Sequence, residues 1–188
     1  MRDISLHVLD IMQNSTAAQA SRIMVIAAVE AAAGVLKLVI EDNGCGMDSD
    51  LLASVTDPFM TTRTTRKVGL GIPLFKASAE QSGGSFTITS QKGVGTMVTA
   101  IFSIDHIDRP VLGDLAGVIT DMAAANPTVE IILQLENTDT QFIFNSGEVR
   151  KALGEVPLSE FEVVRWLREY IGEGLKEIFG GVLSEIVS

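Results

Sequence analysis

The spacing of apolar residues along the chain alternates between the period of a helix and that of a strand. Leu6, Leu9 and Met12 recur at helical spacing behind the capping residues Asp3 and Ser5, which predicts an N-terminal helix. Apolar runs rich in Val and Ile predict strands, and Gly-containing turns separate them. In chain order, the pattern predicts a helix at 3–20, strands at 21–29 and 34–40, a loop with a short helical piece at 48–68, a helix at 71–83 and a hairpin at 85–104.

The pattern restarts after residue 105 with a second set of elements. It predicts a helix at 110–125, a hairpin at 128–145 and short and long helices at 147–153 and from 159 onward. Ser159 and Glu162 have the spacing of a capping box for the last helix. Its expected apolar stripe is Phe161, Val164, Leu167 and Ile171, and the aromatic residues expected in the core are Trp166, Tyr170 and Phe179.

Charge and composition narrow the class of protein. Of the 188 residues, 46% are hydrophobic, which argues against a disordered chain. The 24 acidic side chains outnumber the 14 basic ones and give a net charge of −10, so a surface that coats nucleic acid is not expected. A single cysteine excludes an internal disulfide framework and a Cys-rich metal site, and it favours a reducing, cytoplasmic location.

The sequence shows no convincing export or membrane segment. The N-terminal residues mix acidic side chains and His7 into the first predicted turns, unlike a signal peptide. The longest apolar stretch, 23–40, contains Glu30 and Lys37, which are costly in a bilayer and fit two strands around a turn better. We therefore expect a soluble protein, with His7 on the helix surface or in the capping turn.

The acidity is unevenly distributed between two regions. Residues 1–104 carry 8 basic and 9 acidic side chains, whereas residues 105–188 carry 6 basic and 15 acidic ones. This difference predicts two domains with different roles, divided at 104/105.

Three motifs in the first region carry candidate chemistry. Asp10 and Asn14 lie four residues apart, so a helix would place both on one face, although a solvated helix surface gives the same spacing. Asp42 and the glycines Gly44 and Gly46 directly follow a predicted strand. The glycines would let the backbone approach a ligand closely, and the Asp42 carboxylate could accept a hydrogen bond from an amino group of that ligand. The alternative is an ordinary Asn-Gly hairpin turn.

The third motif is a glycine pair at the start of a predicted helix. Lys67, Gly69, Leu70 and Gly71 stand where free backbone N–H groups and the helix dipole favour phosphate. Loop flexibility would also account for the glycines. Each motif alone is weak, but their order is informative.

Together with Thr96 in a second glycine turn at 93–96, these motifs resemble the ATP-binding domain of the GHKL superfamily, which includes DNA gyrase, heat-shock ATPase chaperones, histidine kinases and MutL proteins. The resemblance covers residues 1 to about 104. It implies the Bergerat fold: an α+β, two-layer sandwich with a mixed, mostly antiparallel sheet, here with an α+β C-terminal extension. Residues 57–63 resemble the phenylalanine box and ATP lid of histidine kinases.

The resemblance also implies a role for each matching residue. Asn14 would ligate Mg²⁺, Asp42 would bind the adenine amino group, and Gly44, Gly46 and Met47 would line the base. The other residues expected to bind ATP are Thr61, Arg63, Lys67, Gly69, Leu70, Gly71 and Thr96. Asp10 stands where the family usually has glutamate as the catalytic base, and its shorter side chain implies slow hydrolysis or completion of the site by a partner.

The ATP-binding motifs begin close to Met1, so no helical hairpin with a phosphorylated histidine is expected before them. The leading hypothesis is therefore a stand-alone Mg-ATP-binding protein that is a slow ATPase or a kinase acting in trans on a protein partner. The alternative is a non-catalytic ATP sensor that regulates a partner through the lid or the acidic C-terminal region. In a third hypothesis the ATP-binding domain has lost its activity, and residues 105–188 carry the function of the protein. The layout of this region weakly resembles small ATP-binding proteins that accompany hydrogenase or NADH-dehydrogenase-type redox subunits.

Overall fold

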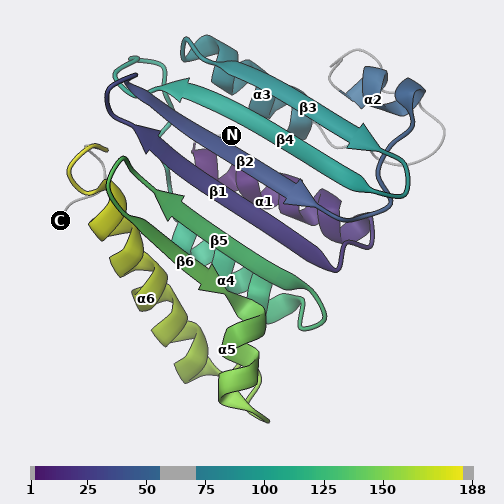
Figure 1. Cartoon of the computed structure of the whole chain (residues 1–188), viewed down its shortest axis with the longest axis vertical. Coiled ribbons are helices and arrows are strands. Elements are labelled where there is room, and N and C mark those ends of the chain that lie inside the picture. The colour runs from purple at the N-terminus through teal and green to yellow at the C-terminus, as the bar shows by residue number, and fades with distance from the viewer. Residues whose placement is uncertain (1–2, 56–70, 184–188) are drawn as a thin grey trace.

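The computed structural model describes residues 3–55 and 71–183 of the chain (Figure 1). In chain order, its elements are α1 (Ile4–Ala17), β1 (Arg22–Glu30), β2 (Val35–Asp42), α2 (Ser49–Val55), α3 (Gly71–Gln81), β3 (Ser85–Gln91), β4 (Gly95–Ser103), α4 (Leu115–Ala125), β5 (Glu130–Glu136), β6 (Gln141–Asn145), α5 (Ser146–Leu153) and α6 (Phe161–Phe179).

A six-stranded sheet with the order β3-β4-β2-β1-β5-β6 forms the centre of the molecule. The β1/β5 pair is parallel and the other four pairs are antiparallel, which confirms the predicted mixed, mostly antiparallel sheet. Helices α1, α3 and α4 lie against one face of this sheet, and α6 packs on α4 beside β6 (Figure 1). The α+β layered fold expected from the motifs is therefore confirmed.

Period-two burial explains why the helices cover one face only. On β1, Ile23, Val25 and Ala27 are buried on the helix side, while the intervening positions are more exposed. Their parallel partners on β5 continue the same face with Ile131 and Leu133. Burying each such side chain stabilises the fold by about 1.5–3 kcal/mol. Because β5 pairs with β1, strands from both sides of residue 104 share one sheet and one hydrophobic core. The division into two domains remains a prediction.

The N-terminal helix is fixed at its start. The Asp3 carboxylate accepts from the Leu6 N–H at 3.0 Å, as the capping pattern predicted, and the Ile4 N–H donates to the Val111 carbonyl. The first bond caps α1, and the second joins this helix to the segment that precedes α4. His7 lies in the first turn of α1, which was one of its two predicted places, but it is only 1% exposed and stacks on Phe75 of α3, so the other prediction, a position on the helix surface, is wrong.

Two helix starts differ from the sequence prediction. Helix α4 begins at Leu115 rather than at 110, because Gly113 has φ +74° and Asp114 caps the helix through the Gly117 N–H. Helix α6 begins at Phe161 without a side-chain cap. The predicted capping box of that helix is therefore wrong.

The predicted partners in α6 are used differently. Glu162 accepts from Arg165 at 2.6 Å instead of capping the helix. In the predicted stripe, Leu167 and Ile171 are buried, whereas Phe161 is 70% exposed. The prediction of core aromatics holds for Phe179 but is wrong for Trp166 and Tyr170, which are surface residues.

The helices within residues 3–55 and 71–183 were also compared with the length and hydropathy that a membrane crossing requires. None of them meets both criteria.

Candidate functional site

The carboxylate of Asp42, at the end of β2, is held in one orientation by two donors. Its Oδ1 accepts from the Gly44 N–H at 2.8 Å, and its Oδ2 accepts from the Ser15 hydroxyl of α1 at 2.6 Å. The β2/β4 register places Thr96 opposite Asp42. Since each carboxylate oxygen has two acceptor sites, both can accept a further hydrogen bond from a ligand.

Helix α1 joins the two predicted halves of the site. Ser15, which binds Asp42, directly follows Asn14, and it is 1% exposed, whereas Asn14 faces solvent. The C-terminal end of the same helix binds the turn a second time, because the Ala18 carbonyl accepts from the Cys45 N–H at 2.9 Å. The sequence analysis did not single out Ser15. Its position next to Asn14 was the only indication in the sequence that its hydroxyl could belong to the site.

The glycines of the turn are required by contacts within the protein. A Cβ atom on Gly44 would lie 2.9 Å from the Cβ of Ala18 and 3.0 Å from Asp42 Oδ1. Gly46 has φ +62° and packs directly on the Gln91 carbonyl of β3. The turn is therefore pressed against α1 on one side and β3 on the other, which fixes the backbone around Asp42.

Ser90 connects the far end of this turn to β4. Its hydroxyl accepts from the Met47 N–H at 2.8 Å and lies 2.9 Å from both the Gly95 carbonyl and the Thr96 hydroxyl. Met47 is half-buried and packs against the core. Ser90 thus positions two of the predicted adenine-side residues, Met47 and Thr96, although the sequence analysis missed it.

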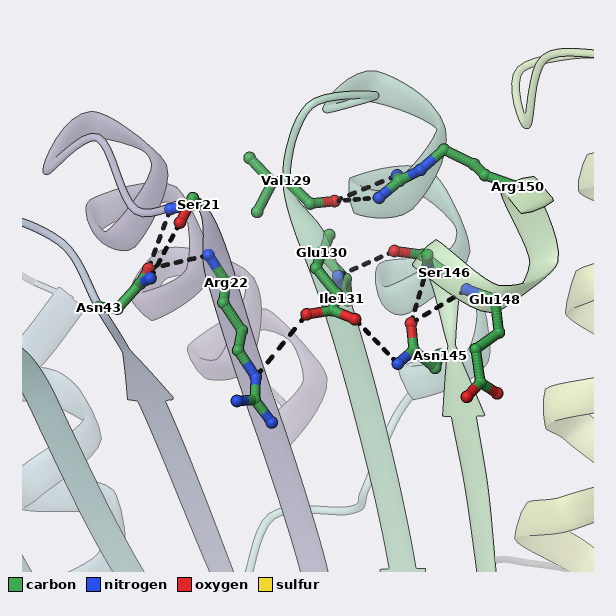
Figure 2. A network of polar contacts seen from close by, with 11 residues as sticks. Ser21, Arg22, Asn43, Val129, Glu130, Ile131, Asn145, Ser146, Glu148 and Arg150 are labelled. Atoms are coloured by element: carbon green, nitrogen blue, oxygen red, sulfur yellow. Dashed lines mark hydrogen bonds and ion pairs between the residues drawn. The ribbon is translucent and has the colours of Figure 1, made fainter.

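A polar belt anchors the turn on its other side, across the strand ends (Figure 2). The Asn43 side-chain oxygen accepts from the backbone N–H groups of Ser21 and Arg22 at 2.9 and 2.8 Å. Arg22 forms an ion pair with Glu130 at 3.9 Å, and Glu130 accepts from Asn145 at 3.0 Å. The belt therefore runs from the Asp42 turn to the start of α5 in the C-terminal region.

The second half of the site lies where α1 meets the start of α3. A Cβ atom on Gly71 would lie 2.9 Å from Asp10 Oδ2 and 3.1 Å from the Cβ of Asp10, so the first residue of α3 closely approaches this carboxylate. Burial raises the pKa of Asp10 because desolvation disfavours its charged form. The start of the 11-residue helix α3 thus lies beside Asp10, and Asp10 is one helical turn from Asn14.

The structure brings together most of the predicted residues that it describes. Asp42, Gly44, Gly46, Met47 and Thr96 form one group, held together by Ser15 and Ser90. Asp10, Asn14 and Gly71 form the other. The predicted residues that lie outside the described part of the chain are Thr61, Arg63, Lys67, Gly69 and Leu70, together with the lid motif at 57–63.

A cavity of about 540 Å³ borders the Asp42 turn on the sheet face away from α1. Met24, Glu41, Thr89 and Met97 contribute to its lining. Because these positions alternate with the buried ones, the cavity lies on the open face of the sheet. Neither Asp10 nor the other residues of its group line it.

Residues 2–106 match the family described as "Histidine kinase-, DNA gyrase B-, and HSP90-like ATPase". The chain belongs to this family. The matched residues include both groups of the site, and the match ends just beyond β4. The fold and the ATPase class expected from the motifs are therefore confirmed.

Several curated relatives are sensor kinases. The chain is 40% identical over 72 residues to a putative sensor protein of Shewanella frigidimarina, covering 38% of this chain and 11% of that protein. It is 38% identical over 66 residues to the signal transduction histidine-protein kinase AtoS of Escherichia coli, covering 35% and 11%. The histidine protein kinase DivJ of Caulobacter vibrioides is 32% identical over 99 residues, covering 50% and 14%. The chain therefore spans only a small part of each of these relatives.

A solved structure supports the same fold. The N-terminal domain of a DNA repair protein superposes with a TM-score of 0.54 at 14% identity, covering 76% of this chain and 52% of that one. The catalytic domains of histidine kinases are thus related to this chain by sequence, and the DNA repair protein resembles it in fold alone.

Proposed function

We propose that this chain binds Mg-ATP at the two groups described above and uses it as a slow ATPase or as a kinase acting on a separate protein. The observation that carries the proposal is the Asp42 carboxylate, which Ser15 and Gly44 fix in place and which keeps acceptor capacity on both oxygens. An exocyclic amine such as that of adenine is a donor that matches it.

The described residues fit Mg-ATP. Asn14 exposes an amide side chain one turn from Asp10, and Asp10 lies beside the start of α3, where phosphate oxygens are favoured. Within residues 3–55 and 71–183 no cluster of three or more His, Cys, Asp or Glu comes together. Mg²⁺ would take an oxygen from Asn14 together with oxygens from phosphates and water, in keeping with its preference for octahedral oxygen ligands.

Asp10 is the candidate base. When bound, the metal would neutralise charge on the transferring phosphoryl group, and the protein has to orient the attacking group. The raised pKa of Asp10 makes its carboxylate a better proton acceptor than an exposed aspartate. Its close approach to Gly71, at the start of α3, supports a role at the phosphate end, and its short side chain would account for the slow turnover that we expect.

The test is Mg-ATP binding and phosphate release by the purified chain. We expect nucleotide-dependent thermal stabilisation that Asp42→Asn weakens by at least about tenfold in Kd, equivalent to about 1.4 kcal/mol, since an amide supplies only one acceptor atom. Asp50→Asn, in the exposed first turn of α2, is the matched control and should bind as the unaltered chain does. The proposal fails if ATP does not bind, or if Asp42→Asn and the control bind equally.

The second candidate function is a non-catalytic ATP sensor that regulates a protein partner. It is favoured by the polar belt, which connects the Asp42 turn to the C-terminal region and offers a route for a binding signal (Figure 2). Comparing Asp10→Ala with Asn14→Ala separates the two functions. An enzyme loses turnover with either variant, whereas a sensor retains ATP-dependent partner binding without Asp10 and loses it without Asn14.

A further inference from the structure

Two large aromatic side chains of α6 are stacked on the surface. The rings of Trp166 and Tyr170 lie 5.3 Å apart and are almost parallel, at 6°, and Tyr170 also contacts Phe142 of β6 at 5.0 Å. Trp166 is 51% exposed and Tyr170 is 37% exposed. The stack is thus pre-formed and fixed from below by Phe142, and it presents a broad aromatic surface to solvent.

The position of α6 explains this exposure. The helix turns Leu167, Ile171 and Ile178 into the core, and residues 166 and 170 flank this stripe. Strand β6 is the last strand of the sheet, with β5 as its neighbour, and α6 runs beside it (Figure 1). In the described part of the chain, no further layer covers the flank of α6 that lies beyond this edge.

Carboxylates surround the aromatic stack. Glu169, Glu173 and Glu177 each lie three or seven positions after Trp166 or Tyr170, so they share the side of the helix that carries the aromatic stack. All three are exposed, and within residues 3–55 and 71–183 none has an ion-pair partner.

The arginines of α6 are engaged elsewhere. Arg165 binds Glu162 at 2.6 Å, and Arg168 binds both carboxylate oxygens of Asp121 on α4 at 2.9 and 3.0 Å. Their positive charge is therefore paired locally, and the remaining cation of α6, the exposed Lys176, forms no ion pair with these carboxylates within the described residues. The surrounding region is also acidic, since residues 105–188 carry 15 acidic and 6 basic side chains.

We propose that the surface formed by Trp166, Tyr170, Glu169, Glu173 and Glu177, here called the acidic aromatic face, binds an arginine-rich segment of a protein partner. A guanidinium group stacks on an aromatic ring and at the same time binds a carboxylate in a bidentate manner. The face supplies both kinds of partner within one helical surface. A second copy of the chain would bring carboxylates against carboxylates and is disfavoured by charge. The inference does not depend on ATP binding.

Trp166 is the only tryptophan of the chain, so its fluorescence reports directly on this surface. The full-length chain is titrated with a short peptide of alternating Arg and Ala residues and, separately, with the corresponding Glu-Ala peptide. We expect a saturable change in emission with the Arg-Ala peptide only, with a Kd that rises as salt is added because the carboxylates contribute.

Variants distinguish binding at the acidic aromatic face from attraction of the peptide to the overall negative charge of the chain. Tyr170→Ala and Glu173→Gln should each raise the Kd for the Arg-Ala peptide by about five- to tenfold, while melting temperatures confirm that both remain folded. Glu80→Gln, an exposed glutamate on α3 at the opposite edge of the sheet, is the matched control and should leave the Kd unchanged.

Three results would overturn the inference. The first is equal binding of the Arg-Ala and Glu-Ala peptides. The second is a Kd for Tyr170→Ala and Glu173→Gln that equals that of the control. The third is a dimer in sedimentation that Tyr170→Ala dissociates, because the face would then be occupied by a second copy of the chain.

Discussion

Replacing Ser15 with alanine tests the contact that joins the two halves of the candidate site. The change removes one hydroxyl from a side chain that is 1% exposed, and it leaves Asp42 Oδ2 without its 2.6 Å donor. The same hydroxyl lies 3.1 Å from the Ile11 carbonyl, but it has one proton, and the shorter, charge-assisted bond to the carboxylate is the stronger one.

The expected cost follows from the charge of the acceptor. A hydrogen bond to a charged group contributes about 1.5–3 kcal/mol, so we expect Ser15→Ala to lower the free energy of unfolding by about 2 kcal/mol. For a chain of this size that corresponds to a fall in melting temperature of roughly 4–8 °C. Ser82→Ala is the matched control, because Ser82, directly after α3, is equally buried but donates only to the neutral Ala79 carbonyl in the last turn of that helix. Its cost should be below about 1 kcal/mol.

Chemical denaturation of four proteins measures the contact itself: the unaltered chain, Ser15→Ala, Asp42→Ala and the double variant. We expect a coupling energy of about 1–2 kcal/mol between the two positions. The reasoning is refuted if the two single effects add to within about 0.5 kcal/mol in the double variant. If the chain binds ATP as proposed, Ser15→Ala should also weaken that binding, because the carboxylate loses its fixed orientation.

Three further predictions concern stability. Burial lowers the pKa of His7 from 6.5 to about 4, so the folded chain binds a proton at this side chain less readily than the unfolded chain does. The free energy of unfolding should therefore fall by as much as roughly 3 kcal/mol as the pH is lowered from 6.5 to 4. In denaturation curves measured across this range, His7→Leu should show a weaker dependence on pH. Gly174→Ala gains about 1 kcal/mol of helix propensity, but it places a Cβ atom 2.7 Å from the Phe142 ring. The cost of this overpacking should exceed the gain in helix propensity, so the melting temperature should fall. Asn145→Ala removes both the 2.7 Å cap to the Gly147 N–H of α5 and the 3.0 Å bond to Glu130, and it should cost at least about 1 kcal/mol in chemical denaturation. Asn145→Asp keeps the capping oxygen but places a carboxylate against Glu130, so it should restore only part of this loss.

The elements of the fold could largely be predicted because their signals are local. Apolar runs rich in Ile and Val predict β1 and β2, and the capping side chain of Asp3 predicts the start of α1. The pairing of β5 with β1 could not be predicted in this way. It joins residues more than a hundred positions apart, and only the shared burial of Ile23 and Ile131 on one face reveals it.

Only part of the candidate site could be predicted, because some of its residues act through contacts between segments that are far apart in the sequence. Asp42 and Asn14 belong to motifs that the sequence displays, whereas Ser15 and Ser90 act through contacts with distant segments. Ser90 meets Met47 across 43 positions, and nothing near Ser90 in the sequence marks it. Residues that bind ligand can thus be identified from motifs, while the residues that position them appear only when the strands are paired.

The surface position of Trp166 follows from the same topology. An amphipathic helix with a large aromatic residue beside its apolar stripe normally buries that residue, because a globular core surrounds the helix on more than one side. Helix α6 packs at the edge strand β6, so the core meets it on the Leu167 side alone. The Glu residues on the open flank agree with that geometry, since a buried flank would not hold three carboxylates that lack an ion-pair partner within residues 3–55 and 71–183. Had the edge position been evident, the sequence Trp166-Leu167-Arg168-Glu169-Tyr170 would have predicted a half-exposed aromatic pair.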